Sequence, residues 1–204
     1  MTDSYEVPDA ELVEEIPKIK GSRFLASVAP VDSEAEAAEH LERARKAEHA
    51  ARHHCWAYRL GPAGDVTRSS DAGEPSGSAG KPILAAIEGR GLTNVSVVVT
   101  RYFGGTKLGV GGLVRAYGDA AAAALAQVPT RVIVPTRIVD ISVPYDQLGT
   151  LETIVAREGV ERPEGVYGDF VTFAFEIPVA DAQGFAARVF DASSGRIQAE
   201  VREK

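Results

Sequence analysis

Cysteine is nearly absent from this chain of 204 residues, in which Cys55 is the one cysteine. A disulfide within the chain is therefore excluded, and a lone thiol is typical of a reducing compartment. Long apolar runs are lacking too, since no stretch reaches the roughly 18 residues that a membrane-spanning helix needs. The first 20 residues are acidic and contain no apolar segment typical of a signal peptide. We therefore expect a cytoplasmic protein without membrane association.

Positive charge is in deficit, because 22 basic residues face 29 acidic ones and leave a net charge of -7. This balance argues against a protein that coats nucleic acid by electrostatics alone. Residues 81–115 are the exception, with five basic side chains against Glu88: Lys81, Arg90, Arg101, Lys107 and Arg115. An anion site on an acidic body is one interpretation of this stretch, and a solvated surface of mixed charge is the other.

Metal-ligating side chains are too few for a structural zinc site. His49, His53, His54 and Cys55 lie close together in the sequence, but such a site needs about four ligands and no second Cys/His pair follows. In a strand, His53 and Cys55 point to one face and His54 to the other. We therefore expect no metal and no cofactor, and we expect Cys55 to pack as a small buried side chain.

Composition and periodicity indicate a soluble protein with two domains. The content of 45% hydrophobic and 25% charged residues is ordinary for a globular protein. The composition changes around residues 129–135, so we divide the chain into domains 1–134 and 135–204. The hydrophobic pattern of the first domain predicts these elements: two strands within 11–31, a helix at 33–51, strands at 53–60 and 66–70, a helix at 82–88, a buried strand at 94–101 and a helix at 113–128.

The second domain shows a β-α-β-β-α-β pattern in about 70 residues. Its predicted elements are a strand at 138–145, a helix at 147–158, a turn-rich segment at 160–168, a strand at 169–178, a helix at 181–191 and a strand at 195–202. This order is that of a ferredoxin-like domain. The expected fold class is therefore α+β, in two domains.

Two glycine-rich loops hold the candidate site residues, and the first, at residues 71–80, is rich in carboxyl and hydroxyl groups. Asp71 and Glu74, with His54 assisting, are the candidates for acid/base catalysis. Ser76 and Ser78 are the loop candidates, although the G-x-S-x-G pattern of a nucleophilic serine is missing. Serine before a helix is more often a turn or cap residue, and Ser78 is placed to cap the helix that follows.

The second loop, at residues 104–112, leads directly into a helix. Backbone N–H groups at a helix N-terminus bind anions, and Gly104, Gly105, Gly111 and Gly112 would allow a ligand to approach them. The charged candidates for contact with an anion or nucleic acid are Arg101, Lys107 and Arg115. Neither a P-loop nor a G-x-G-x-x-G pattern is present, so no nucleotide is identified. Close packing of the loop on the sheet is the alternative, and spacing leaves both open.

Three segments together resemble the signature blocks of the IMPACT/YigZ family: HHCWAYRL (53–60), SDAGEPSGSAGKPIL (70–84) and LTNVSVVVTRYFGGTKLGVGGLVRAY (92–117). The resemblance covers about residues 17–130, and the part from about 138 is similar to the small C-terminal domain of bacterial YigZ-type members. Ala72 stands where a second acidic residue is frequent in the family, and Ser78 where threonine is frequent. Ala72 counts against any mechanism or metal site that needs two adjacent carboxylates.

The resemblance implies a first domain similar to the second domain of small-subunit ribosomal protein five. It implies a second domain similar to the C-terminal domains of elongation factor G. Eukaryotic IMPACT proteins regulate translation initiation largely through an added N-terminal domain, and only about 16 residues precede the shared region here, so we do not expect that role.

The function implied by the resemblance is that of a translation-associated regulatory or binding protein, whose partner is RNA or a ribosomal component. Two alternatives stay open. One is a hydrolase-type enzyme acting on a phosphorylated or nucleotide ligand at the glycine-rich loops. The other is a protein–protein module that binds through Tyr102 and Phe103. The sequence decides neither whether the protein is an enzyme nor its oligomeric state.

Overall fold

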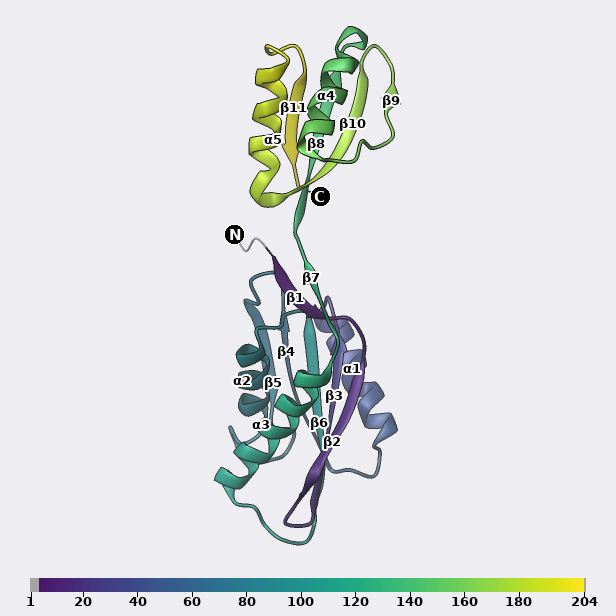
Figure 1. The fold of residues 1–204 in the computed structure, drawn as a ribbon. Helices are drawn as coiled ribbons and strands as arrows, with labels where there is room; N and C mark the ends of the chain where they lie inside the picture. The colour runs from purple at the N-terminus through teal and green to yellow at the C-terminus, as the bar shows by residue number, and fades with distance from the viewer. Residues whose placement is uncertain (1–3, 204) are drawn as a thin grey trace. The chain divides into compact units, whose positions relative to one another are not determined.

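The structure is a computed structural model that describes residues 4–203 and divides into two compact units, residues 1–133 and 134–204 (Figure 1). The elements of the first unit are β1 (Tyr5–Pro8), β2 (Leu12–Ile19), β3 (Ser22–Pro30), α1 (Glu34–Ala47), β4 (His53–Leu60), β5 (Val66–Ser70), α2 (Gly80–Arg90), β6 (Val95–Tyr102), α3 (Val110–Gln127) and β7 (Thr130–Ile133). Every element predicted for residues 11–128 is present, with shifts of a few residues at the ends.

The first unit is built on a five-stranded antiparallel sheet in the order β2-β3-β6-β4-β5. Strand β6 lies at its centre and is buried from Val95 to Arg101, as its apolar run predicts. Helices α2 and α3 cover one face of the sheet and α1 covers the other (Figure 1). The buried side of α3 is rich in alanine, so its backbone can lie close to the sheet.

A two-stranded pair, β1 with β7, is the part of this unit that the sequence does not predict. Tyr5 pairs with Ile133 and Pro8 with Thr130, in antiparallel register. The two segments are more than 120 residues apart, and each is too short to show a period. Their pairing places β1 beside the segment that follows α3.

The second unit holds a four-stranded antiparallel sheet in the order β11-β8-β10-β9. Its elements are β8 (Thr136–Val143), a 3-10 turn at Tyr145–Gln147, α4 (Leu148–Glu158), β9 (Val166–Tyr167), β10 (Val171–Pro178), α5 (Val179–Ala192) and β11 (Gln198–Arg202). Both helices pack on one face of the sheet (Figure 1). The predicted β-α-β-β-α-β order and the α+β class are confirmed, and the turn-rich segment contains the short strand β9.

Within residues 4–203, none of the helices is long and apolar enough to cross a membrane.

Candidate functional site

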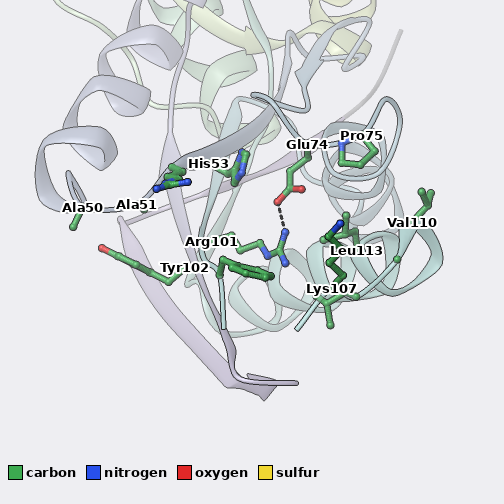
Figure 2. A pocket seen from close by; sticks show the side chains of 14 residues that line it. Ala50, Ala51, His53, Glu74, Pro75, Arg101, Tyr102, Lys107, Val110 and Leu113 are labelled. Carbon is green, nitrogen blue, oxygen red and sulfur yellow. Dashed lines mark hydrogen bonds and ion pairs between the residues drawn. The ribbon is translucent and has the colours of Figure 1, made fainter. Parts of the chain in front are cut away.

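A pocket of about 760 Å³ opens in the first unit where the end of β6, the 71–80 loop and the N-terminus of α3 meet (Figure 2). Residues 50–53, which lead into β4, complete its wall. Both glycine-rich loops therefore border one cavity, although they lie on opposite sides of β6 in the sequence. The pocket is open: Phe103, at its edge, is 57% exposed, and Tyr102 is half-buried.

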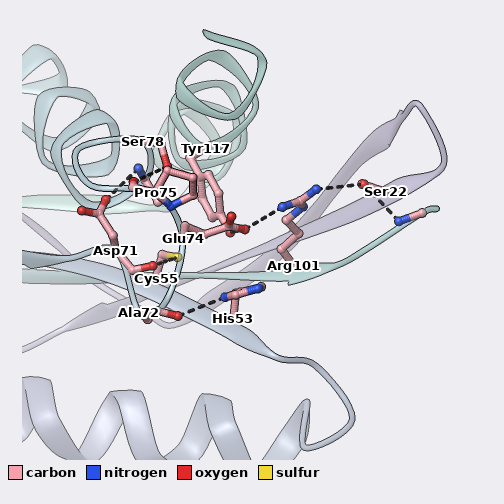
Figure 3. A network of polar contacts seen from close by, with 12 residues as sticks. Ser22, His53, Cys55, Asp71, Ala72, Glu74, Pro75, Ser78, Arg101 and Tyr117 are labelled. Carbon is pink, nitrogen blue, oxygen red and sulfur yellow. Dashed lines mark hydrogen bonds and ion pairs between the residues drawn. The ribbon is translucent and has the colours of Figure 1, made fainter. Parts of the chain in front are cut away.

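A buried ion pair lies in the wall of this pocket. The Arg101 guanidinium donates from Nη1 to Glu74 Oε1 at 2.7 Å, and the two side chains are 7% and 5% exposed. Tyr117 donates its hydroxyl to the same oxygen at 2.8 Å (Figure 3). Burial raises the pKa of Tyr117 far above its usual range, so this hydroxyl remains a donor. Oε1 of Glu74 thus accepts hydrogen bonds from two donors.

Arg101 has more donors than partners. Its Nη2 reaches Ser22 Oγ only at 3.5 Å, and the guanidinium lies 5.7 Å from the ring centre of Phe24 and 5.6 Å from that of Phe103. Its Nε is the one fully buried side-chain nitrogen or oxygen within residues 4–203 that has no hydrogen-bond partner. A guanidinium carries five N–H groups, so Arg101 keeps capacity for further acceptors.

Asp71 caps helix α2. Its carboxylate accepts hydrogen bonds from the backbone N–H groups of Gly77, Ala79 and Gly80 at 2.8–2.9 Å. Burial alone would raise the pKa of Asp71, but these three bonds and the charge of Lys81 outweigh it and lower the pKa below its ordinary value. A carboxylate already committed to three backbone donors is a structural group, so the expected acid/base role of Asp71 loses its geometric basis.

The predicted cap by Ser78 is wrong. Its hydroxyl donates instead to the carbonyl of Pro75 at 2.6 Å, and the side chain is buried. One hydroxyl oxygen has too few lone pairs to serve several N–H groups, whereas the two oxygens of Asp71 serve three. Ser76 is exposed on the same loop.

His53, and not His54, faces the pocket. His53 Nδ1 lies 3.0 Å from the carbonyl oxygen of Ala72 (Figure 3). His54 points to the other face of β4 and bonds the carbonyl of Glu48 at 3.2 Å, and burial lowers the pKa of His54. The expected assistance of catalysis by His54 therefore has no support in the geometry. Strand alternation, which separates the two histidines, was the signal that could have selected His53.

Cys55 lies behind this wall as a buried thiol, as predicted. Its sulfur donates to the carbonyl of Asp71, and burial raises the pKa of Cys55 to about 12. The thiol is therefore neutral and unreactive at physiological pH. Within residues 4–203, no three His, Cys, Asp or Glu side chains come together as a metal-binding group.

The N-terminus of α3 opens on the pocket without a side-chain cap. Gly109, with φ 72°, is its cap residue, and no acidic side chain lies in the first turn. The N–H of Leu113 bonds the carbonyl of Gly109, so the N–H groups of the residues between them point out of the helix. The dipole of an 18-residue helix adds positive potential at this point.

The candidate glycines of the second loop separate into two groups. A Cβ on Gly104 would lie 1.9 Å from the carbonyl carbon of Gly21, and one on Gly112 would lie 3.1 Å from Leu108 Cβ. A Cβ on Gly105 or Gly111 would meet nothing within 4 Å. Packing therefore explains Gly104, whereas Gly111 lies in an open helix turn where packing does not require glycine.

The basic candidates also differ in position. Lys107 lines the pocket and is exposed, whereas Arg115 is exposed on α3 outside the pocket. Arg52 lines the pocket as well, although the sequence did not single it out. In the described part of the chain, none of these three forms an ion pair. The pocket thus has two unpaired cations, Lys107 and Arg52, near an uncapped helix N-terminus.

This arrangement defines a class of protein. It is an α+β chain of two units, and the first unit carries an open pocket lined by a helix N-terminus and by basic side chains. Comparison with known families then identifies it further. A model of the Impact N-terminal domain matches residues 20–125, and a model of a domain of unknown function, DUF1949, matches residues 141–196. The chain belongs to the IMPACT family, as its signature blocks indicate.

Curated relatives match over most of their length. The chain is 41% identical to an IMPACT family member encoded in a pol 5′ region of Thermus thermophilus, over 89% of this chain and 99% of the relative. It is 37% identical to IMPACT family member YigZ of Escherichia coli, over 96% and 97% of the two chains. A crystal structure of a hypothetical protein, 34% identical, covers 100% of both chains with a TM-score of 0.69.

Proposed function

We propose that this IMPACT family protein is a translation-associated binding protein that contacts single-stranded RNA through the pocket of its first unit. The observation that carries the proposal is the uncapped N-terminus of α3, which opens on the pocket next to Lys107 and Arg52. First-turn N–H groups, the helix dipole and unpaired cations are the groups that hold a phosphate. Arg101 lies in the same wall, where its Nη1 is bonded to Glu74 and its unpaired Nε is fully buried.

The edge of the pocket supports a single strand over a duplex. Phe103 is 57% exposed, and one side of its ring is supported by Arg101. An exposed aromatic ring beside a cationic groove is a stacking platform for an unpaired base, worth about 1–3 kcal/mol per base. Bases in a duplex are already stacked and cannot use it. One phosphate at α3 and one base on Phe103 would therefore place one nucleotide.

The RNA contacts are assigned to the first unit because the second repels a polyanion. Residues 134–204 hold seven basic and twelve acidic residues, a net charge of -5. The face of its sheet that lies away from the helices carries Asp140, Glu176 and Glu200. That face carries none of the aromatic side chains with which sheets bind RNA within the described strands, and its basic residue Arg202 is paired with Asp140. The link to translation rests on the similarity to translation components that the family resemblance implies for both units.

Binding of a 12-nucleotide single-stranded RNA, followed by fluorescence anisotropy across a salt series, tests the proposal. If two phosphates are contacted, affinity falls about sevenfold between 50 and 200 mM salt, at a slope of about 0.7 per phosphate. Lys107→Glu and Arg52→Glu each weaken binding and flatten the salt dependence. Co-sedimentation of the same proteins with ribosomes tests the link to translation. We expect the wild-type protein to co-sediment with ribosomes and the Lys107→Glu and Arg52→Glu variants to do so less.

Arg131→Glu is the matched control. Arg131 is an exposed arginine on β7, which follows the C-terminus of α3, so the helix length of about 27 Å separates it from the pocket. The net charge changes as in the other two variants, and we expect RNA binding close to wild type. Absence of RNA binding at 50 mM salt, or equal losses in all three variants, contradicts the proposal.

One observation favours the hydrolase alternative: a histidine faces the pocket, and its ring nitrogen Nε2 has no partner in the described part of the chain. Such a nitrogen could accept a proton from water or from a hydroxyl. Incubation of nucleotides and RNA with the protein, with His53→Gln as the comparison, tests it by chromatography of the products. Turnover that His53→Gln abolishes would support an enzyme over a binding protein.

A further inference from the structure

We infer that the pocket selects ribose over deoxyribose, because His53 Nε2 accepts a hydrogen bond from the 2′-hydroxyl of the nucleotide whose phosphate lies at α3. This inference rests on the proposed binding of RNA and adds the group that distinguishes RNA from DNA. It assigns a specificity role to a residue that neither the glycine pattern nor the charge pattern indicated.

The tautomer of a neutral His53 ring follows from its partner. Nδ1 lies 3.0 Å from the carbonyl oxygen of Ala72, and a carbonyl oxygen only accepts hydrogen bonds. Nδ1 therefore carries the hydrogen, and in the neutral ring Nε2 is left with a lone pair. Within residues 4–203, Nε2 has no partner and is not fully buried, so it is an acceptor open to the pocket.

The backbone keeps this acceptor in place. Ala72 has φ 44° and Gly73 has φ 88°, so two successive residues are in the left-handed region. That conformation is costly for alanine, and the bonds of Asp71 to the start of α2 hold the loop in it. The loop thereby aims the Ala72 carbonyl at His53. A ring fixed in this way pays little ordering entropy when a ligand binds.

A second acceptor lies next to it. Glu74 uses Oε1 for both Arg101 and Tyr117, and Oε2 has no hydrogen bond within the described residues. Oε2 is also not among the fully buried atoms, so it stays open to solvent. His53 and Arg101 are paired residues of neighbouring strands, which brings the histidine ring beside the ion pair (Figure 2).

The pocket therefore has two chemical halves. The α3 N-terminus, Lys107 and Arg52 offer donors and positive charge, whereas His53 Nε2 and Glu74 Oε2 offer lone pairs. A ligand that satisfies both halves must carry an anion and a hydroxyl donor. A ribonucleotide has this combination in its phosphate and 2′-hydroxyl, and a deoxyribonucleotide lacks the hydroxyl. The 2′-hydroxyl is the group by which proteins tell RNA from DNA.

Three oligonucleotides of one base sequence test the inference: all-ribose, all-2′-deoxy with uracil retained, and all-2′-O-methyl. We expect the wild-type protein to bind the ribose form about tenfold more tightly than the deoxy form, since the deoxy form leaves an acceptor without a partner. The 2′-O-methyl form has an oxygen but no donor hydrogen. We expect it to bind no better than the deoxy form.

His53→Leu removes the acceptor and keeps an apolar side chain of similar size in the strand. We expect it to bind the ribose and deoxy forms equally well, because neither can then gain or lose a hydrogen bond at this position. His54→Leu is the matched control: the histidine next in sequence lies on the opposite face of β4, so the ribose preference survives. Thermal melting of each variant checks that both remain folded.

The outcomes separate this inference from the proposed function. Equal binding of ribose and deoxy forms by the wild type overturns the inference and leaves RNA binding in place. A ribose preference that persists in folded His53→Leu overturns the assignment to His53. If no oligonucleotide binds, both the proposed function and the inference fail. A preference lost in His53→Leu and kept in His54→Leu establishes the assignment.

Discussion

Arg101 Nη1 lies 2.7 Å from Glu74 Oε1, in an ion pair that is almost fully buried between the central strand and a loop 27 residues earlier in the chain. The pair fastens the 71–80 loop to the end of β6. It also explains why Arg101 is not a free phosphate ligand, because its charge is already paired with the carboxylate of Glu74. Ligand contact must come from its remaining N–H groups.

Loss of the Glu74 charge should destabilise the first unit strongly. Glu74→Gln leaves the charged Arg101 buried without its counter-ion, and we expect a loss of about 3 kcal/mol in the free energy of unfolding. Urea unfolding followed by the fluorescence of Trp56, the single tryptophan, reports on this unit alone. Glu15→Gln, which breaks the exposed pair with Arg23, is the control and should cost less than about 1 kcal/mol. Equal losses would contradict this account.

Asp71 should stabilise the protein in a pH-dependent way. Its pKa is lower in the folded than in the unfolded chain, so its contribution is present above the unfolded value of about 3.9 and is lost as the pH falls through the folded pKa. Asp71→Ala should therefore cost about 1–2 kcal/mol at pH 7 and less at pH 3. Ser33→Ala removes the uncharged cap of α1 and should cost a similar amount at both pH values.

The burial of His40 should make the protein less stable in mild acid. The ring is 1% exposed and bonded to Ser27 Oγ at 2.8 Å and Ser96 Oγ at 2.9 Å. Burial, with the charge of Arg43, lowers the pKa of His40 to about 4. The unfolded chain takes up this proton near pH 6.5, so the free energy of unfolding should fall between pH 6.5 and 4, by up to about 3 kcal/mol.

Urea unfolding at pH 7.5, 5.5 and 4.5 measures that dependence, and His40→Gln should show a flatter profile. An NMR titration of the His40 ring with a midpoint near 6.5 would contradict the prediction. Such a midpoint would mean that the folded first unit accepts a positive charge on His40, whose hydrogen-bond partners are the neutral hydroxyls of Ser27 and Ser96.

The sequence predicted those features that depend on neighbours in the chain. The apolar run of β6 indicated a central strand, and alternation separated His53 and Cys55 from His54. The helix predicted at 33–51 begins at its N-cap, Ser33, whose Oγ accepts from the Glu36 N–H. Each of these signals is complete within one period of a strand or helix.

The features that it did not predict depend on how distant segments meet. Nothing local to Asp71 shows that its carboxylate reaches the N–H groups eight and nine residues later, so Ser78 was the better local guess. The partner of Arg101 was hidden for the same reason. The His53 acceptor depends on a left-handed Ala72, a conformation that the residue type argues against. The polar contacts of the pocket thus depend on tertiary structure, although the two glycine-rich loops that border it stand out in the sequence.

Two glycines of the second loop should respond to alanine in opposite ways. Gly111 lies in the first turn of α3 with ordinary helical backbone and open space around the position of a Cβ. Gly111→Ala should therefore leave the fold as stable or stabilise it by up to about 1 kcal/mol, because alanine favours helix. The same methyl group would stand where a phosphate approaches the helix N–H groups, so RNA binding should weaken several-fold.

In Gly104→Ala the methyl group would overlap the backbone of Gly21, so unfolding by urea should become easier. A stable Gly111→Ala that binds RNA as the wild type does would show that the ligand does not use the N-terminus of α3.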